Sequence, residues 1–149
     1  MGMGKGLVFV PDLIEVIVTK THADFQAAGL FNTINLFTLP PGGEIVTFAM
    51  NCTVTFAGGG GMNTYTIESG QAGDLDGILI ASANLFGVGV PLLHKSVGAD
   101  FFLTVAGAAL QPIWSMTAAT VIRATARSNV ALSNSTGGSV TWYAKYTVH

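Results

Sequence analysis

Apolar and polar residues alternate one by one along the stretch from Val46 to Phe56. A period of two places successive side chains on opposite faces of an extended strand, whereas the buried stripe of a helix repeats every 3.6 residues. The same alternation runs along Ala118–Arg127 and Val140–Val148. These stretches are rich in Val, Thr and aromatic residues, which suit a half-buried pleated surface. They predict long β-strands with one face in a core.

The phase of the alternation assigns side chains to that core. The predicted core residues are Val46, Phe48, Met50, Cys52, Val54, Phe56, Val140, Trp142 and Tyr146. Cys52 is the only cysteine of the chain. No intrachain disulfide can therefore form, and a free thiol on the apolar side of a strand behaves as a small buried hydrophobe.

Clusters of Gly, Pro, Asp and Ser separate the alternating stretches. Turns or loops are predicted at residues 40–43, 58–61, 70–77 and 133–138. Further strands are predicted near residues 13–20, 33–39, 63–69, 78–82 and 100–105, and a short helical turn is predicted within residues 21–28. About eight strands at this spacing indicate an all-β, single-domain β-sandwich, and a jelly roll is the arrangement that we expect. The sandwich is assigned to residues 14–149.

Residues 1–13 are predicted to form a short N-terminal extension. The stretch is apolar but stands apart from the first strand, so we interpret it as a docking arm. The candidate interface residues in it are Leu7, Val8, Phe9, Val10 and Leu13.

The chain has few charges for its length. Only 9% of its 149 residues are charged, against roughly 25% in an ordinary soluble domain. Threonine occupies the outer positions of the predicted strands, where many sheets carry Lys or Glu that prevent unwanted strand pairing. We infer that neighbouring protein chains cover much of the surface.

The charge distribution argues against nucleic acid as a partner. The net charge is −2, and the six basic residues are scattered along the sequence, whereas phosphate binding needs a basic patch. Membrane insertion is not expected either, because polar residues and glycines interrupt the uncharged stretches. The short apolar run before Pro11 does not match a secretory signal. We expect a soluble protein that is made in the cytoplasm and is not secreted.

No pattern of residues predicts catalysis, so we expect neither an enzyme nor a cofactor. The histidines His22, His94 and His149 lack metal-ligand spacing. Asp74 and Asp76 form the only close pair of carboxylates and are weak candidates for a hard-cation site. Because Asp and Gly favour turns for local reasons, we interpret this loop as a turn and predict no metal.

Several local stretches resemble small capsid-decoration, or cement, proteins of tailed bacteriophages. They are Val18–Phe25, Asn35–Pro40, the glycine-rich hairpin at 58–61 and the closing strand at Thr136–Tyr143. The resemblance implies a β-sandwich or jelly roll, a homotrimer, and a position on the outer surface of the virion that braces neighbouring capsomers of the major capsid protein. It implies no catalytic residues.

The leading hypothesis is a structural virion protein that binds the outside of a phage capsid and stabilises the shell. Two alternatives remain open at this point. One is another particle component of the tail, baseplate or head fibre. The other is a carbohydrate-binding jelly roll with an exposed aromatic platform, for which the aromatic candidates are Trp114, Trp142, Tyr143 and Tyr146, although alternation favours Trp142 and Tyr146 as core residues.

Overall fold

The computed structural model describes residues 12–79, 82, 84–87, 93–96, 102–103, 111–112 and 117–149. The strands are β1 (Ile14–Thr21), β2 (Phe31–Leu39), β3 (Gly43–Gly58), β4 (Tyr65–Gln71), β5 (Asp74–Leu79), β6 (Leu93–Ser96), β7 (Phe102–Leu103), β8 (Gln111–Pro112), β9 (Thr120–Ser128) and β10 (Ser135–Val148). Helical structure in the described residues is limited to α1 (His22–Phe25) and the 3-10 turn η2 (Leu132–Asn134). Strands therefore dominate, as the alternation predicts.

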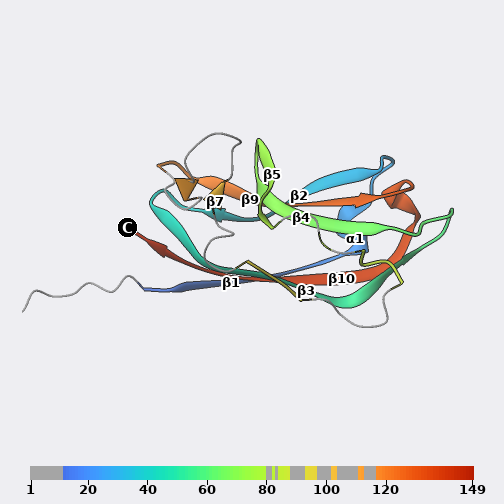
Figure 1. Cartoon of the computed structure of the whole chain (residues 1–149), viewed down its shortest axis with the longest axis horizontal. Helices are drawn as coiled ribbons and strands as arrows, with labels where there is room; N and C mark the ends of the chain where they lie inside the picture. Colours follow the sequence, from blue (N-terminus) through green and yellow to red (C-terminus); the bar gives the residue numbers. More distant parts are fainter. Residues whose placement is uncertain are drawn as a thin grey trace, which may run out of the picture.

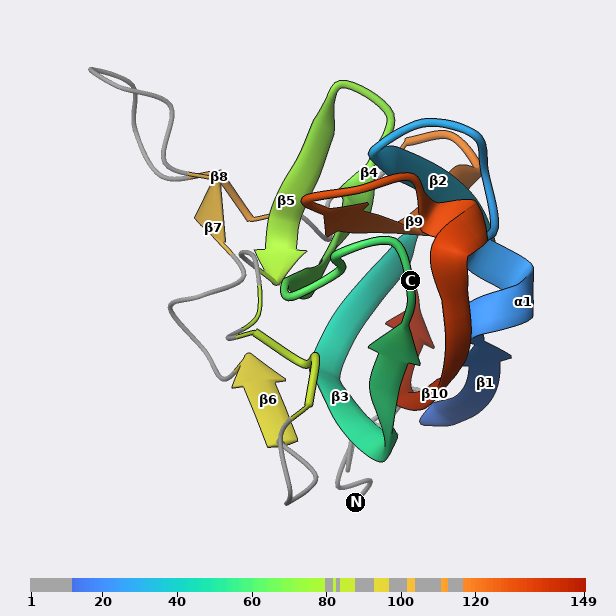
Figure 2. The ribbon, with the colours of Figure 1, turned by 90° about the vertical axis from the view of Figure 1, so that its right-hand side faces the viewer.

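Two antiparallel four-stranded sheets form the sandwich (Figures 1 and 2). Sheet A has the order β1-β10-β3-β6, and sheet B has the order β2-β9-β4-β5. The first of these eight strands pairs with the last, the second with the seventh, the third with the sixth and the fourth with the fifth. This nesting of pairs is that of a ribbon rolled up into two layers, which is a jelly roll. The predicted fold class is confirmed.

The short helix α1 connects sheet A to sheet B at the side where β1 and β2 lie (Figure 2). Thr21 caps it, and the Asp24 carboxylate accepts a hydrogen bond from the Thr21 backbone N–H at 2.8 Å. This reciprocal capping satisfies amide groups that a free helix start would leave unpaired. The helix places Phe25, which is fully buried, against Trp142, with ring centroids 6.4 Å apart.

Most of the predicted core residues are buried between the sheets. Those below 4% exposure are Phe48, Met50, Cys52, Phe56, Val140 and Trp142. Tyr146 is half-buried and stacks on Phe37, with an angle of 8° between the ring planes. Sheet B contributes Ile67, Ile122 and Ala124 from its inner face.

Val46 and Val54 contradict the predicted phase, because they are 47% and 55% exposed. The cause is a set of β-bulges where β3 pairs with β10. Lys145 pairs with Thr47 and Tyr146 with Ile45, so Val46 has no opposite residue. Each extra residue turns the following side chains to the other face. Ile45, only 2% exposed, takes the inward position instead.

Two further irregularities flank Val54. Val140 pairs with Cys52 but Ser139 pairs with Val54, and Gly137 then pairs with Ala57. Two changes of phase cancel, so Phe56 returns to the core. Gly138 makes room for it: φ is 129°, and a Cβ built there would lie 2.3 Å from Cδ1 of the Phe56 ring. A side chain at this position would displace the ring.

The predicted loop at 70–77 is shorter than expected. β4 continues to Gln71, and β5 begins at Asp74, which pairs with Gln71. Gly73 has a φ of 88° and makes the tight connection possible. Asp74 and Asp76 therefore belong to a strand next to a hairpin turn.

Candidate interaction surfaces

One of the candidate interface residues, Leu13, lies in the described part of the chain. Leu7, Val8, Phe9 and Val10 are outside the described residues. Leu13 is 57% exposed and immediately precedes β1. The chain thus enters the sandwich through an exposed leucine at the beginning of an edge strand.

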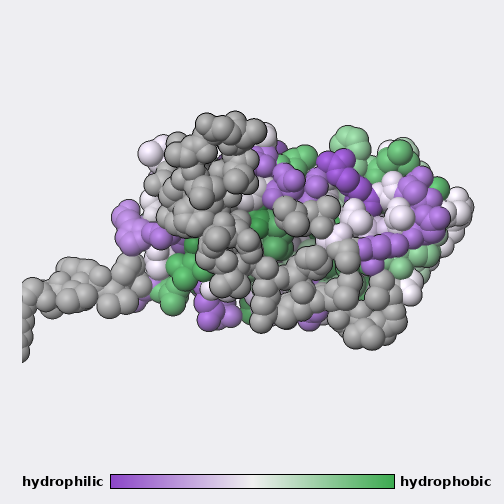
Figure 3. Space-filling view, in the orientation of Figure 1, coloured by the Kyte–Doolittle hydropathy of each residue, from purple (hydrophilic) through white to green (hydrophobic). Residues whose placement is uncertain are grey.

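The outer face of sheet A carries exposed apolar side chains in adjacent strands. Ile17 of β1 lies opposite Tyr143 of β10, which lies opposite Ala49 of β3. Ile17 is 59% exposed and Tyr143 is 40% exposed. In Figure 3, hydrophobic surface is visible at the lower left, where β1 begins and β10 ends. A row of neighbouring apolar side chains on a solvent-facing sheet is typical of an interaction surface.

Few charges interrupt this face. Glu15 lies directly opposite Lys145, and Thr47 follows on β3. Opposite charges in register favour the strand pair and offset one another. The next row contains threonines, with Thr19 and Thr141 joined by a hydrogen bond of 2.8 Å between their hydroxyls. Lys95 of β6 lies opposite Ala49. The part of the face formed by β1, β10 and β3 therefore carries few charges.

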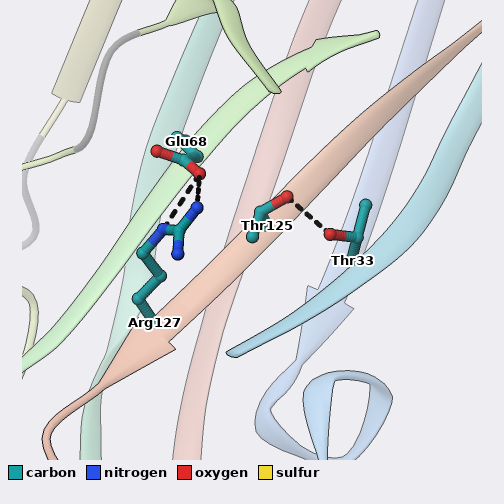
Figure 4. A network of polar contacts seen from close by, with 4 residues as sticks. All are labelled: Thr33, Glu68, Thr125 and Arg127. Carbon is teal, nitrogen blue, oxygen red and sulfur yellow. Dashed lines mark hydrogen bonds and ion pairs between the residues drawn. The ribbon is translucent and has the colours of Figure 1, made fainter. Parts of the chain in front are cut away.

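The outer face of sheet B has a different character, shown in Figure 4. Arg127 donates from Nε and Nη2 to Oε1 of Glu68, at 3.0 and 2.8 Å. The Arg127 guanidinium also lies 5.4 Å from the centre of the Phe31 ring. Beside this pair, the hydroxyls of Thr33 and Thr125 are hydrogen-bonded at 2.8 Å. The ion pair holds β9 to β4, and the threonines hold β9 to β2.

The side chains of Asp74 and Asp76 lie close together on β5. No group of three His, Cys, Asp or Glu residues suitable for a metal occurs in the described part of the chain. Partial burial raises the pKa of the Asp74 carboxyl, and a hydrogen bond with Asp76 and the like charge of Asp76 raise it further. The structure places the pair on β5, next to the turn at Gly73, and not within a loop.

This raised pKa leads to a pH-dependent prediction. The folded protein holds the Asp74 proton more tightly than the unfolded chain, so the group favours folding below its ordinary pKa and loses that contribution as pH rises through the raised value. Asp74→Asn imitates the protonated state. We expect it to raise the melting temperature at neutral pH and to have little effect near pH 3, about where Asp is protonated in both states.

Differential scanning calorimetry of the variant at several pH values measures this effect. Asp12→Asn, at an exposed position outside the strands, removes the same charge and serves as the control. An equal rise in melting temperature in both variants would show that overall charge, rather than the Asp74–Asp76 pair, is responsible. A calcium-dependent rise in melting temperature that Asp74→Asn removes would instead reveal a cation site.

The histidines are not brought together. His149 pairs with Glu44 through Nε2 and Oε2 at 2.8 Å, and its backbone N–H donates to the Gly42 carbonyl at 2.9 Å. His22 begins α1 on the side of the sandwich, and His94 lies in β6, opposite Met50. The His149 contacts hold the end of the chain to the turn before β3.

The aromatic residues offer little support for a sugar platform. Trp142 is buried, and Trp114 lies outside the described residues. Among the described aromatic residues, those with large exposure are Phe31 and Tyr143. They lie on the outer faces of different sheets, so they cannot stack on one sugar.

Among the residues that the structure describes, no helix has the length and hydrophobicity needed to cross a bilayer.

Comparison with known proteins relates the chain to phage particles through its fold. No protein-family model and no curated protein sequence matches it. Among solved structures, it is similar to a chain of the cyanophage Pam1 capsid asymmetric unit, with a TM-score of 0.59 and 12% identity over 100% of this chain and 98% of that chain. A chain of the acid-stable capsid of Helicobacter pylori bacteriophage KHP30 matches with a TM-score of 0.44 and 12% identity over 93% and 94% of the two chains. The chain thus shares the fold of a component of a phage capsid structure.

Proposed function

We propose that this protein is a non-catalytic structural component of a bacteriophage virion, which binds the outside of the capsid and stabilises the shell by bridging capsomers. The likeness to a chain of the Pam1 capsid asymmetric unit carries the proposal, because it extends over nearly the whole of both chains. Its partners are further copies of itself, as a homotrimer, and the major capsid protein. The protein acts on the capsid surface after synthesis in the host cytoplasm.

The surface of the sandwich supports this role. The protein has 9% charged residues and exposes Ile17, Val46 and Tyr143 on sheet A. Covering this apolar surface with a partner is favourable because it removes the surface from water. Burial of apolar area contributes roughly 25 cal/mol per Å², while each association costs translational and rotational freedom. Repetition around a symmetric shell adds many such contacts. We assign the outer face of sheet A to the assembly contacts.

Stabilisation of the shell follows from linkage. A protein whose site is built from adjacent capsomers binds the intact shell better than separated subunits, and it stabilises the shell by that difference. Particles assembled without this protein should form but burst at a lower temperature or under weaker osmotic shock. Adding the purified protein back should restore their resistance.

Two variants with equal charge change test the surface. Tyr143→Lys places a charge on the outer face of sheet A, and Phe31→Lys places one on sheet B. We expect Phe31→Lys protein to restore depleted particles and Tyr143→Lys protein to restore them poorly. Full rescue by both variants would show that the outer face of sheet A does not make the assembly contacts. Depleted particles that are fully robust but fail to attach to cells would replace the proposal with a head-fibre role.

A further inference from the structure

β1 is an edge strand of sheet A among the strands that the structure describes. β1 pairs with β10 over all eight of its residues, from Ile14–Tyr146 to Thr21–Ser139, without a register shift. No strand in the described part of the chain pairs with its other side. Such an edge presents a row of unpaired backbone N–H and C=O groups, which are a template for an additional strand.

β1 has few of the features that usually protect an edge. It contains no proline, no glycine and no bulge, whereas β2, the corresponding edge of sheet B, has a bulge between Asn35 and Phe37. Its two charged residues are Glu15 and Lys20, and Glu15 faces Lys145. Ile17 at 59% and Ile14 at 39% exposure leave apolar surface beside the open edge. An added strand would cover both the backbone groups and these side chains.

A strand of suitable composition is attached to the same edge. Residues 7–10, which lie outside the described residues, have the sequence Leu-Val-Phe-Val and are followed by Pro11 and Asp12. β-branched and aromatic residues of this kind favour strand pairing. The four residues 7–10 would span roughly 13 Å when extended, about half the length of the eight-residue β1.

The connection disfavours pairing of this segment with the β1 of its own chain. A two-residue hairpin over Pro11 and Asp12 would need a type I′ or II′ turn, with positive φ at its first central residue. Proline holds φ near −65° and cannot adopt that turn. The residue before it, Val10, is restricted to extended conformations. β1 begins at Ile14, so a three-residue loop over residues 11–13 is the next alternative, and its last residue would be left-handed. None of the described non-glycine residues, Leu13 included, has a positive φ. Short hairpins onto the same chain are therefore disfavoured, which favours a neighbouring copy as the receiver.

We propose that residues 7–10 of each copy add as a strand to the free edge of β1 in a neighbouring copy. This inference rests on the self-association included in the proposed function and names the contact that produces it. Arm and edge are different surfaces, so the contact is heterologous and can close into a ring such as a trimer. Each copy then both donates an arm and receives one.

Deletion variants of the purified full-length protein test the arm. Removal of residues 2–10 should convert the oligomer to a folded monomer in light scattering, with loss of hydrogen-exchange protection at β1 amides. Removal of residues 2–6 alone, which spares the apolar run, should leave the oligomer intact. An unchanged oligomer after removal of 2–10, or a monomeric full-length protein, would overturn the inference.

A complementation experiment tests the receiving edge. Leu13→Lys/Ile17→Lys adds charges at exposed positions beside the edge, and Val54→Lys, an exposed valine on β3, is the control. We expect a monomer for the double variant and the normal oligomer for the control. A mixture of the double variant with the 2–10 deletion should form a one-to-one heterodimer, because one supplies the arm and the other the edge. Absence of that heterodimer contradicts arm exchange.

These measurements use no capsids and are independent of the test of the proposed function. If the purified protein exchanges arms but particles that lack the protein are fully robust, only the capsid role is contradicted. If the variant that lacks residues 2–10 remains an unchanged oligomer and still restores depleted particles, only the arm exchange is contradicted.

Discussion

Trp142→Ala should destabilise the protein by about 3–5 kcal/mol, a large part of the stability of a typical domain. Trp142 is 1% exposed and packs against Phe25 of α1. Its indole Nε1–H donates to Oγ of Ser69 at 3.0 Å. Since Trp142 belongs to sheet A and Ser69 to sheet B, the side chain joins the two layers. Its removal leaves a cavity and a buried hydroxyl without its donor.

Urea denaturation measures the loss, and Tyr143→Ala is the matched control. Tyr143 follows in the same strand but points outward and is 40% exposed, so its replacement should cost much less. Trp142→Phe should fall between wild type and Trp142→Ala, because it retains a ring but loses the hydrogen bond to Ser69. Equal losses in the variants at positions 142 and 143 would contradict the assigned faces of β10.

Phe48→Ala should likewise cost about 3–5 kcal/mol, whereas Val46→Ala should change the free energy of unfolding by only about 0.5 kcal/mol. Phe48 is fully buried, and Val46 is 47% exposed at the bulge. Simple alternation assigns both side chains to the same face, so the pair distinguishes a regular strand from a bulged one.

The same denaturation experiment measures this difference, and Val54→Ala extends it to the second irregular site. Val54 lies between two register shifts and is 55% exposed. A small loss at Val46 and Val54 together with a large loss at Phe48 is the expected outcome. Losses of similar size at Val46 and Phe48 would mean that β3 pairs with β10 in an unbroken register.

The alternation of apolar and polar residues is enough to predict most of the strands and much of the inner face. Alternation in β3 and β10 identified Phe48, Met50, Cys52 and Trp142 as buried residues, because side-chain direction in a strand is a local property with a period of two. Eight strands with turn signals between them also indicated the sandwich. The low charge content indicated a surface that other protein chains cover.

The places where the alternation changes phase, and the choice of neighbouring strands, depend on contacts between distant parts of the chain. The bulge at Val46 depends on how many residues of β10 lie opposite, which the sequence of β3 does not contain. The pairing of Trp142 with Ser69, and of Thr33 with Thr125, joins residues far apart in the chain. The position of β1 at the edge of sheet A is also a consequence of the order of the described strands. Local patterns specify which face of a strand is apolar, whereas the partner strand determines register, bulges and edges.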